Sequence, residues 1–301
     1  ITAALQNTGL VPPRHRTIVN LAPADVRKEG SQYDLPIALA FLAATGQITR
    51  VPSDMLVVGA LNLDGSLQPV PGIFAIAECA RQLGVRSLVV PAGNASEAYA
   101  AGLTVLAPAT LKELLDHVEE RTPLAPVTAT ADLLAVVPHD IPDLVSIAQQ
   151  AHAKRALEIA AAGGHNLLLH GPPGAGKSLL AKALLGILPE LSDTEAFEVT
   201  KIWSIRGLLP AGSGLLRTRP FRAPHHSVSA VALVGGGANP QAGEVTVAHR
   251  GVLFLDEFAE FPRHVLEHLR QPIEEGVVHV SRAAGSVTFP DVVFATAQRA
   301  K

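Results

Sequence analysis

Eight consecutive residues near the middle of the chain combine turn-forming residues with one lysine and one hydroxyl. They are, in order, Gly171, Pro172, Pro173, Gly174, Ala175, Gly176, Lys177 and Ser178. A turn with so little side-chain bulk lets backbone N–H groups and the positive end of a following helix converge on phosphate oxygens. The pattern G-x-x-x-x-G-K-[ST] therefore predicts a P-loop that binds ATP and Mg²⁺. We expect Lys177 on the β- and γ-phosphates and Ser178 on the metal.

The runs on either side of these residues supply the setting that a P-loop needs. Residues 166–170 are typical of a short buried strand, and residues 179–188 have helical spacing and good helix formers. Leu179, the first residue of the helical run, completes the predicted nucleotide-binding set. The chain is thus expected to pass from strand to loop to helix at this point.

A second stretch supplies carboxylates. Residues 251–255 form an apolar run that is closed by Asp256 and Glu257. Adjacent carboxylates often mark only a solvated strand end, but this run is apolar enough for a central parallel strand. We therefore predict a Walker B strand, in which Asp256 holds Mg²⁺ through its waters and Glu257 orients the water that attacks the γ-phosphate.

Composition limits the class of protein. The chain has 301 residues, of which 48% are hydrophobic and 17% charged, enough for two globular domains. No stretch reaches the length a bilayer requires and none resembles a signal peptide, so we expect a cytoplasmic protein. The single cysteine, Cys79, excludes an internal disulfide and is expected in the core. Because the net charge is −3, DNA binding would depend on local basic loops.

Residues 1–118 alternate helical and strand patterns and contain no phosphate loop, which predicts an α/β domain. The predicted helices are 34–45, 72–83, 95–101 and 111–118, the predicted strands are 56–61, 87–90 and 104–106, and 62–65 is a predicted hairpin turn. Residues 119–143 contain four prolines and no sustained periodicity, so they predict a linker. The ATPase domain is then 144–301, opening with a helix over 146–163.

Six short motifs in the first domain are VNLAP (19–23), KEGS (28–31), DLPIAL (34–39), residues 59–65, PVPG (69–72) and VVP (89–91). Together they resemble the Lon-protease-like, S5-type α/β domain that precedes magnesium-chelatase-like ATPases and occurs in RadA recombination proteins. Lon peptidases use a serine–lysine dyad, and our alignment places Asp34 and Phe74 at those two positions. The resemblance therefore implies a domain without peptidase activity.

Motifs of the second half extend the resemblance over nearly the whole chain. They are residues 154–166, GILP (186–189), GLLP (207–210), RPFRAPHHS (219–227), ALVGGG (232–237), GE (243–244), LRQPIE (269–274) and SR (281–282). They resemble the AAA+ module of the magnesium-chelatase-like group, and in particular the ComM/YifB family. This implies a three-layer αβα core with a parallel sheet, in a hexameric ATPase that moves along DNA as a helicase, promoting branch migration in natural transformation.

Two other functions fit the same ATP site. A metal-chelatase motor subunit would use ATP to remodel a protein partner, although the fused Lon-like domain disfavours this. A truncated ATPase would bind nucleotide and assemble but turn over poorly. We expect the chain to be part of a longer protein, because it opens at Ile1 and ends at Lys301, before the segment in which the family carries its trans arginine and lid.

The resemblance also implies contacts with single-stranded or branched DNA. Residues 235–243 form a flexible insertion at the place where related rings project a pore loop, which makes Asn239 a candidate. Residues 277–289 predict a hairpin with His279 and Arg282 near its tip, where such rings contact the phosphate backbone. Lys and Arg contacts with phosphate give affinity without sequence specificity. A solvated hairpin tip is the alternative.

Other polar residues have weaker assignments. The pair His225 and His226 lacks companion ligands, so a structural or pore-facing role is favoured over a metal site. Arg270 is the candidate for the subunit contact. A set of arginines could contact subunits or DNA, or form a solvated face: Arg217, Arg219, Arg222 and Arg250. The family pattern expects Asn where Gln298 stands and Gly-Gln where Gln149 and Gln150 stand, and both departures bear more on hydrolysis than on binding.

Overall fold

The computed structural model describes residues 1–13, 15–22, 28–50, 54–128, 141–210, 212–236, 241–270, 272, 277–282, 285–290 and 294–299, the last three as backbone alone. The chain separates into two compact units. The first comprises Ile1–Ala135 with Gly207–Leu215, and the second comprises Val136–Arg206 with Leu216–Lys301. The predicted linker, 119–143, lies in part outside the described residues, and the predicted domain limits stay a prediction.

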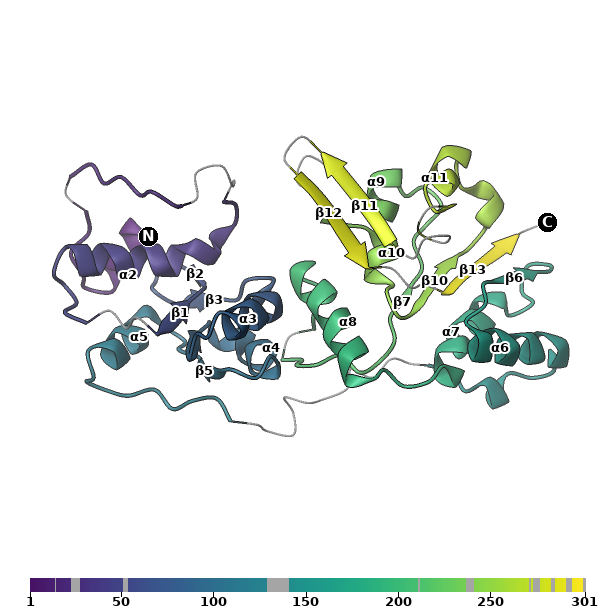
Figure 1. Ribbon diagram of the computed structural model, residues 1–301, viewed down its shortest axis with the longest axis horizontal. Helices are drawn as coiled ribbons and strands as arrows, with labels where there is room; N and C mark the ends of the chain where they lie inside the picture. Colours follow the sequence, from purple (N-terminus) through teal and green to yellow (C-terminus); the bar gives the residue numbers. More distant parts are fainter. Residues whose placement is uncertain are drawn as a thin grey trace. The chain divides into compact units, whose positions relative to one another are not determined.

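A parallel sheet of order β1-β4-β5 organises the first unit (Figure 1). Its strands are β1 (Met55–Val57), β4 (Ser87–Val89) and β5 (Thr104–Leu106), and β2 (Ala60–Leu61) forms a separate hairpin with β3 (Leu67–Gln68). The helices are α1 (Thr2–Asn7), α2 (Asp34–Ala44), α3 (Ile73–Gln82), α4 (Ala95–Ala100) and α5 (Leu111–Val118). Leu35, Leu42, Val89, Leu111 and Leu114 are buried in one shared core.

The single strand predicted over 56–61 is wrong, because the chain leaves the sheet at Gly59. The Val58 N–H still bonds the Val89 carbonyl, but the Gly59 N–H bonds the Gln32 carbonyl, and the Leu35 N–H bonds the Gly59 carbonyl. A Cβ at Gly59 would approach Pro91 Cγ to 2.9 Å, so the close passage requires glycine. The predicted strand therefore becomes β1 and β2, which belong to two different sheets.

The positions compared with the Lon dyad lie at the starts of two helices. Asp34 is the first residue of α2, and Phe74 is fully buried in the first turn of α3. The buried Glu97 carboxylate accepts the Phe74 N–H at 2.9 Å and thereby satisfies a donor at the α3 N-terminus. The expectation that Cys79 is a core residue is wrong, because this thiol lies on the exposed face of α3.

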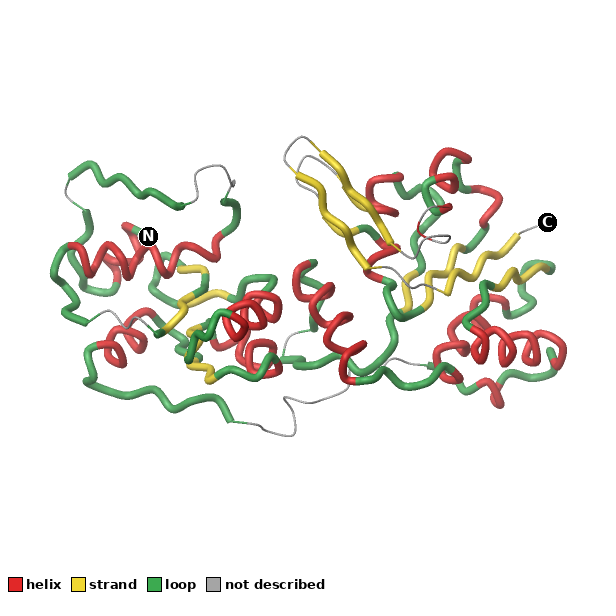
Figure 2. The backbone as a smooth tube through the Cα atoms, in the orientation of Figure 1, coloured by secondary structure: helices red, strands yellow, loops and turns green. Residues whose placement is uncertain are grey.

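The second unit is built on a four-stranded sheet of order β6-β13-β10-β7, and every neighbouring pair is parallel. The strands are β6 (Leu167–His170), β7 (Phe221–Arg222), β10 (Val252–Leu255) and β13 (Phe294–Arg299). Figure 2 shows these strands lying side by side. The helices are α6 (Ala151–Gly163), α7 (Lys177–Ile187), α8 (Asp193–Ile205), α9 (Ala230–Val234), α10 (Glu244–Val247) and α11 (Arg263–Glu267).

Strand β10 is covered on both faces, which explains its uninterrupted apolar sequence. Val252 and Phe254 pack in a cluster with the apolar side of α7, whereas Leu253 and Leu255 pack in a second cluster with α9, α10 and α11. Alternate residues of a strand point to opposite faces, so the sheet has a helical layer on each side. This three-layer αβα core confirms the predicted P-loop fold class.

The helix predicted over 146–163 begins five residues late. A short 3₁₀ turn, η4 (Leu144–Ser146), comes first, and the regular helix α6 starts only at Ala151. Gln149 and Gln150 interrupt the pattern because both have positive φ, 57° and 59°. The Gln150 side chain donates to the Ala175 carbonyl at 3.3 Å, so this bend contacts the predicted P-loop. Helix propensity alone did not predict the left-handed backbone at Gln149 and Gln150.

Two hairpins emerge from the second unit. Strands β8 (Gly235–Gly236) and β9 (Gln241–Ala242) pair antiparallel within the predicted flexible insertion, whose residue Asn239 lies outside the described residues. The hairpin predicted over 277–289 is present as β11 (Val277–Arg282) and β12 (Gly285–Pro290) (Figure 1). In the parts of the chain that the structure describes, no helix is long and apolar enough to cross a membrane.

Candidate functional site

The predicted P-loop lies between the end of β6 and the start of α7. Gly174 and Gly176 both have φ of 79°, a conformation that favours glycine, and Gly176 is the N-cap residue of α7. This helix has 11 residues and no side-chain cap at its N-terminus. Backbone donors at such an end are available to anionic oxygens, and the helix dipole favours negative charge there. The loop can therefore hold phosphate.

Lys177 is held across the loop by its backbone. The residue is 7% exposed, and its Nζ donates to the Gly171 carbonyl at 2.9 Å and to the Pro172 carbonyl at 2.6 Å. An ammonium group has three donors, so it can hold the loop and also reach a phosphate oxygen. The structure thus places the charge over the turn where a triphosphate would lie.

Ser178 and Asp256 meet although they are far apart in the sequence. The Ser178 hydroxyl donates to Asp256 Oδ2 at 3.3 Å. Ser178 stands in the first turn of α7, and Asp256 directly follows β10. One strand, β13, separates β6 from β10, and the carboxyl ends of parallel strands share one edge of the sheet. The strand order therefore brings the predicted magnesium residues together.

The donors at this point suit Mg²⁺. A serine hydroxyl and a carboxylate are hard oxygen ligands, and Mg²⁺ takes one or two protein oxygens together with waters and substrate phosphates. Within the described residues no group of three or more His, Cys, Asp or Glu side chains could hold a metal ion alone. The arrangement fits a metal that is carried in with a nucleotide, rather than one caged by protein.

Glu257 has an unusual backbone for a residue other than glycine. Its φ and ψ are 51° and 47°, in the left-handed region, and its N–H donates to Asp256 Oδ1 at 2.9 Å. Such conformations cost on the order of 1 kcal/mol and concentrate at functional sites. The side chain is half exposed, and its Oε2 lies 3.5 Å from Nδ1 of His226. This contact was not predicted from the sequence.

Comparison with known proteins identifies the family. The family described as magnesium chelatase, subunit ChlI, matches residues 143–298, just over half of the chain. A second family, described as subunit ChlI of Mg-chelatase, matches residues 1–94. The chain belongs to the magnesium chelatase ChlI family. Both halves of the chain thus match magnesium chelatase families, as the sequence motifs predicted.

Individual relatives show to which branch of the family the chain is similar. The uncharacterized protein YifB of Escherichia coli is 44% identical over 292 residues, covering 96% of this chain and 57% of that protein. Competence protein ComM of Haemophilus influenzae is 43% identical over 295 residues, again covering 96% of this chain and 57% of that protein. DNA repair protein RadA of Pseudomonas aeruginosa is 36% identical over 85 residues, which is 27% of this chain and 19% of that protein. The predicted ComM/YifB membership is confirmed, and the chain spans little more than half the length of YifB and ComM.

The structure describes only part of the remaining residues that were predicted to contact DNA, other subunits or nucleotide. His279 and Arg282 lie on β11, where Arg282 pairs with Gly285 at the tip of the hairpin, and their side chains are outside the described residues. Arg270 is exposed after α11. Gln298 pairs with Leu169 on the strand between β6 and β10. Their proposed contacts with DNA, subunits and nucleotide stay predictions.

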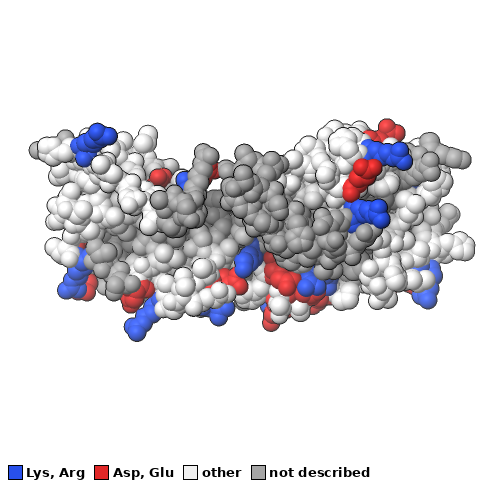
Figure 3. Space-filling model, turned by 45° about the horizontal axis from the view of Figure 1, so that its top comes forward, with Lys and Arg blue, Asp and Glu red and all other residues white. Residues whose placement is uncertain are grey.

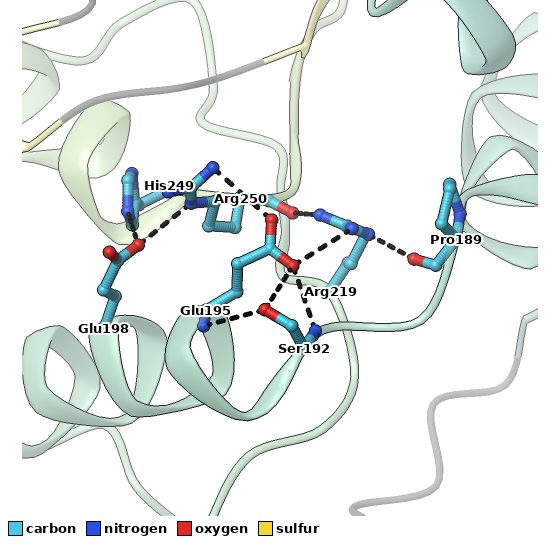
Figure 4. A network of polar contacts seen from close by, with 7 residues as sticks. All are labelled: Pro189, Ser192, Glu195, Glu198, Arg219, His249 and Arg250. Atoms are coloured by element: carbon cyan, nitrogen blue, oxygen red, sulfur yellow. Dashed lines mark hydrogen bonds and ion pairs between the residues drawn. The ribbon is translucent and has the colours of Figure 1, made fainter.

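A second polar cluster lies at the other edge of the same sheet, where β7 and β10 begin (Figure 4). Arg219 precedes β7, and its guanidinium donates to the Arg250 carbonyl at 2.7 Å and to the Pro189 carbonyl at 2.6 Å. Arg250 precedes β10, and Pro189 follows α7. The Arg219 side chain is 11% exposed. It therefore ties the segment after the C-terminal end of α7 to the start of β10.

Two glutamates of α8 complete this cluster (Figure 4). Glu195 forms the capping box with Ser192 and lies 3.4 Å from Arg250 Nη1. Glu198 accepts from Arg250 Nε at 2.9 Å and lies 3.1 Å from Nε2 of the buried His249. The Arg250 and glutamate side chains are partly shielded from water, so their ion pairs are screened less than fully exposed ones. The cluster fixes α8 against the starts of two strands.

The arginines expected to form a solvated face or an outward contact are mostly engaged within the unit. Arg219 and Arg250 belong to the cluster of Figure 4, and Arg222 forms two hydrogen bonds with Glu244, at 2.6 and 2.9 Å. Arg217, which is half exposed, pairs with Asp193. The expectation of a solvated face is wrong for Arg219. These internal contacts help to position the elements of the second unit.

The cluster predicts that the second unit loses stability in acid. Burial lowers the pKa of His249 below its ordinary 6.5, so the folded state resists a proton that the unfolded chain takes up below that pH. Burial of Glu198 opposes its charged form, but hydrogen bonds from Arg250 and His249 outweigh this and lower its pKa below 4.5. The hydrogen bond from the Ser192 N–H lowers the pKa of Glu195 likewise. As the pH falls, protonation of His249 therefore lowers the stability of the fold first, and protonation of the glutamates lowers it further at lower pH.

Urea unfolding measures this effect through the fluorescence of Trp203, the single tryptophan, whose Nε1 donates to the Val247 carbonyl. Between about pH 7.5 and about pH 5.5 the free energy of unfolding should fall, by up to about 1.4 kcal/mol for each pKa unit of depression. The matched variant His249→Gln keeps an amide donor toward Glu198 but does not titrate, so it should fall less. Equal losses in both proteins would contradict the assignment.

Proposed function

We propose that this chain is the nucleotide-binding core of a ring-forming AAA+ ATPase that acts on DNA. The single observation that carries the ATPase assignment is the meeting of Ser178 with Asp256 at the edge where the P-loop opens. The proposed cofactors are ATP and Mg²⁺, the proposed assembly is a homohexamer, and the proposed compartment is the cytoplasm, which a single cysteine suits.

Each residue has a defined task in the proposed hydrolysis. Backbone donors at the α7 N-terminus and the Lys177 ammonium would bind the phosphates and offset the charge that develops on them. Ser178 and Asp256 would hold the magnesium ion, which would help to neutralise the negative charge of the phosphates. Glu257 would orient and polarise the attacking water. An arginine from a neighbouring subunit, for which Arg270 is the candidate, would complete the site.

The DNA assignment has separate support. ComM is named a competence protein, and RadA is named a DNA repair protein. The β11–β12 hairpin carries Arg282 at its tip. On the face shown in Figure 3, Lys and Arg side chains are interspersed with Asp and Glu over the described residues. Because the net charge of the chain is −3, affinity for DNA would come from a few local contacts.

A second function is favoured by the family description itself. The family that matches residues 143–298 is described as magnesium chelatase, subunit ChlI. A chelatase-type motor would use the same ATP site to remodel a protein partner. DNA would then have no effect on its ATP turnover. Measuring ATP hydrolysis with and without DNA therefore distinguishes it from a DNA motor.

The test is ATP hydrolysis by the full-length protein with and without forked DNA. We expect DNA to raise turnover. Turnover that DNA does not change would favour remodelling, and binding without turnover would favour a poorly active ATP-binding module. In the DNA motor, Arg282→Ala should lower the slope of log K against log salt by about 0.7 for each lost contact with single-stranded DNA. Arg217→Ala, which removes an exposed arginine paired with Asp193, is the matched control and should leave the slope unchanged.

A further inference from the structure

The β8–β9 hairpin returns to the second unit through a sharp corner at Gly243. Strand β9 ends at Ala242, and α10 begins at Glu244. A Cβ at Gly243 would approach the Leu233 carbonyl oxygen to 2.4 Å and the Gly235 nitrogen to 2.5 Å. Main-chain atoms cannot move aside as the tip of a side chain can, so the corner requires glycine. The two ends of the hairpin are thus held together against the end of α9.

Two arginines from other elements hold this corner. Nε and Nη2 of Arg222 donate to the two carboxylate oxygens of Glu244, at 2.6 and 2.9 Å. Nη1 of Arg206, the residue that follows α8, donates to Oε1 of Gln241 at 2.9 Å. The side chains of Arg222 and Glu244 are 27% and 19% exposed, so water screens this ion pair less than a fully exposed one. Its two hydrogen bonds also fix how the two side chains face each other.

Arg222 joins the corner to the central sheet. It is the last residue of β7, and its partner in the parallel register is Leu253 of β10. Strand β10 continues to Leu255 and is followed by Asp256, which accepts from Ser178. The corner of the hairpin is therefore anchored to the strand beside the one that leads to the predicted magnesium site.

The partner of Arg222 bears on what this arginine can do. A guanidinium group has five N–H donors, and Nε and Nη2 of Arg222 each direct one of them to Glu244. The carboxylate also offsets the positive charge, so the pair as a whole attracts a phosphate weakly. Such an arginine is better suited to positioning a neighbouring element than to binding a polyanion.

We propose that Arg222 is a positioning residue for the β8–β9 hairpin and that, through Glu244, it sets how tightly the motor binds DNA. This rests on the proposed DNA function, in which the insertion of residues 235–243 forms a pore loop. An element that is already ordered binds more tightly, because less conformational entropy is lost on contact. Arg222 fixes the corner of the hairpin before DNA arrives and thereby reduces that entropic cost.

Titration of the full-length protein with forked DNA at several salt concentrations tests the proposal. Arg222→Gln should raise the Kd about three- to tenfold, because DNA must then order the hairpin as well. The slope of log K against log salt should stay unchanged, since a positioning residue releases no counterion from DNA. Glu244→Gln should weaken binding to a similar extent, although it removes a negative charge that would repel DNA.

Two further variants complete the titration. The charge-swapped protein, which combines Arg222→Glu with Glu244→Arg, restores the ion pair and should recover most of the lost affinity. Arg217→Gln removes an exposed arginine paired with Asp193, so as the matched control it should leave the Kd unchanged. A lower salt slope with Arg222→Gln, or tighter binding with Glu244→Gln, would identify Arg222 as a direct phosphate contact and overturn the proposal. An original Kd in both single variants would overturn it as well.

Hydrogen exchange measures the anchoring of the hairpin without DNA. In the 301-residue chain, the peptide that covers residues 235–242 should exchange faster in Arg222→Gln and in Glu244→Gln, and at the original rate in the charge-swapped protein. The peptide that covers α7 should exchange at the original rate in all of them, which shows that the variants remain folded.

The two measurements keep the hypotheses apart. If the unaltered full-length protein does not bind DNA, the proposed function fails, whereas the exchange rates still test the anchoring. If it binds DNA and the hairpin exchanges at the original rate in both single variants, the positioning role fails and the DNA function stands.

Discussion

Replacing Lys177 by Ala is expected to raise the Kd for ATP on the order of 10- to 100-fold, because a hydrogen bond to a charged group is worth about 1.5–3 kcal/mol. The Lys177 ammonium is nearly buried and sits over the Gly171 and Pro172 carbonyls, at the turn where the phosphates would bind. Calorimetric titration of the 301-residue chain with Mg²⁺ and ATP measures the change.

The matched control is Lys182→Ala, which removes the same charge from an exposed position of α7. It should leave the Kd for ATP unchanged. Because Lys177 also holds the loop, urea unfolding followed through Trp203 must show that the variant remains folded. Folded Lys177→Ala protein that binds ATP with the original affinity would remove the P-loop assignment.

Glu257→Gln has the second large expected effect. The amide keeps the shape of the side chain but cannot polarise a water as a carboxylate does, so kcat for ATP hydrolysis by the full-length protein should fall about 10²- to 10⁴-fold. The Kd for ATP should stay the same, because the P-loop residues and Asp256 are unaltered. Single-turnover hydrolysis and equilibrium binding measure the two quantities separately.

Glu260→Gln is the control, since it changes an exposed carboxylate three residues further along the same turn. Its turnover should equal that of the unmodified protein. If Glu257→Gln protein hydrolyses ATP at the original rate, another residue must orient the water, and the task assigned to Glu257 is refuted.

Local patterns predicted the parts of the fold that depend on neighbouring residues. The P-loop, the apolar strand before Asp256 and the hairpin of residues 277–289 each have a period or a turn signal that can be seen in a short window. The αβα core follows from these strands. The strand over 56–61 was wrong because Gly59 bonds to Gln32 and Leu35, which lie in another segment of the chain.

The errors and omissions near the site have the same origin. The start of α6 was placed too early because the left-handed backbone of Gln149 and Gln150 depends on contacts such as the one with Ala175. The contact of His226 with Glu257 was missed because it depends on β7 and β10 being neighbours. Sheet order was the signal that could have found it, since residues after adjacent parallel strands meet.

The position of the β11–β12 hairpin in the chain has a practical consequence. Strands β10 and β13 are parallel neighbours, so the chain must return from the carboxyl end of one to the amino end of the other, and the hairpin lies within that return. Its two strands pair with each other and add none to the central sheet. Hairpins of other lengths or chemistries can therefore be grafted at this point while the edge of the sheet that carries Ser178 and Asp256 is kept.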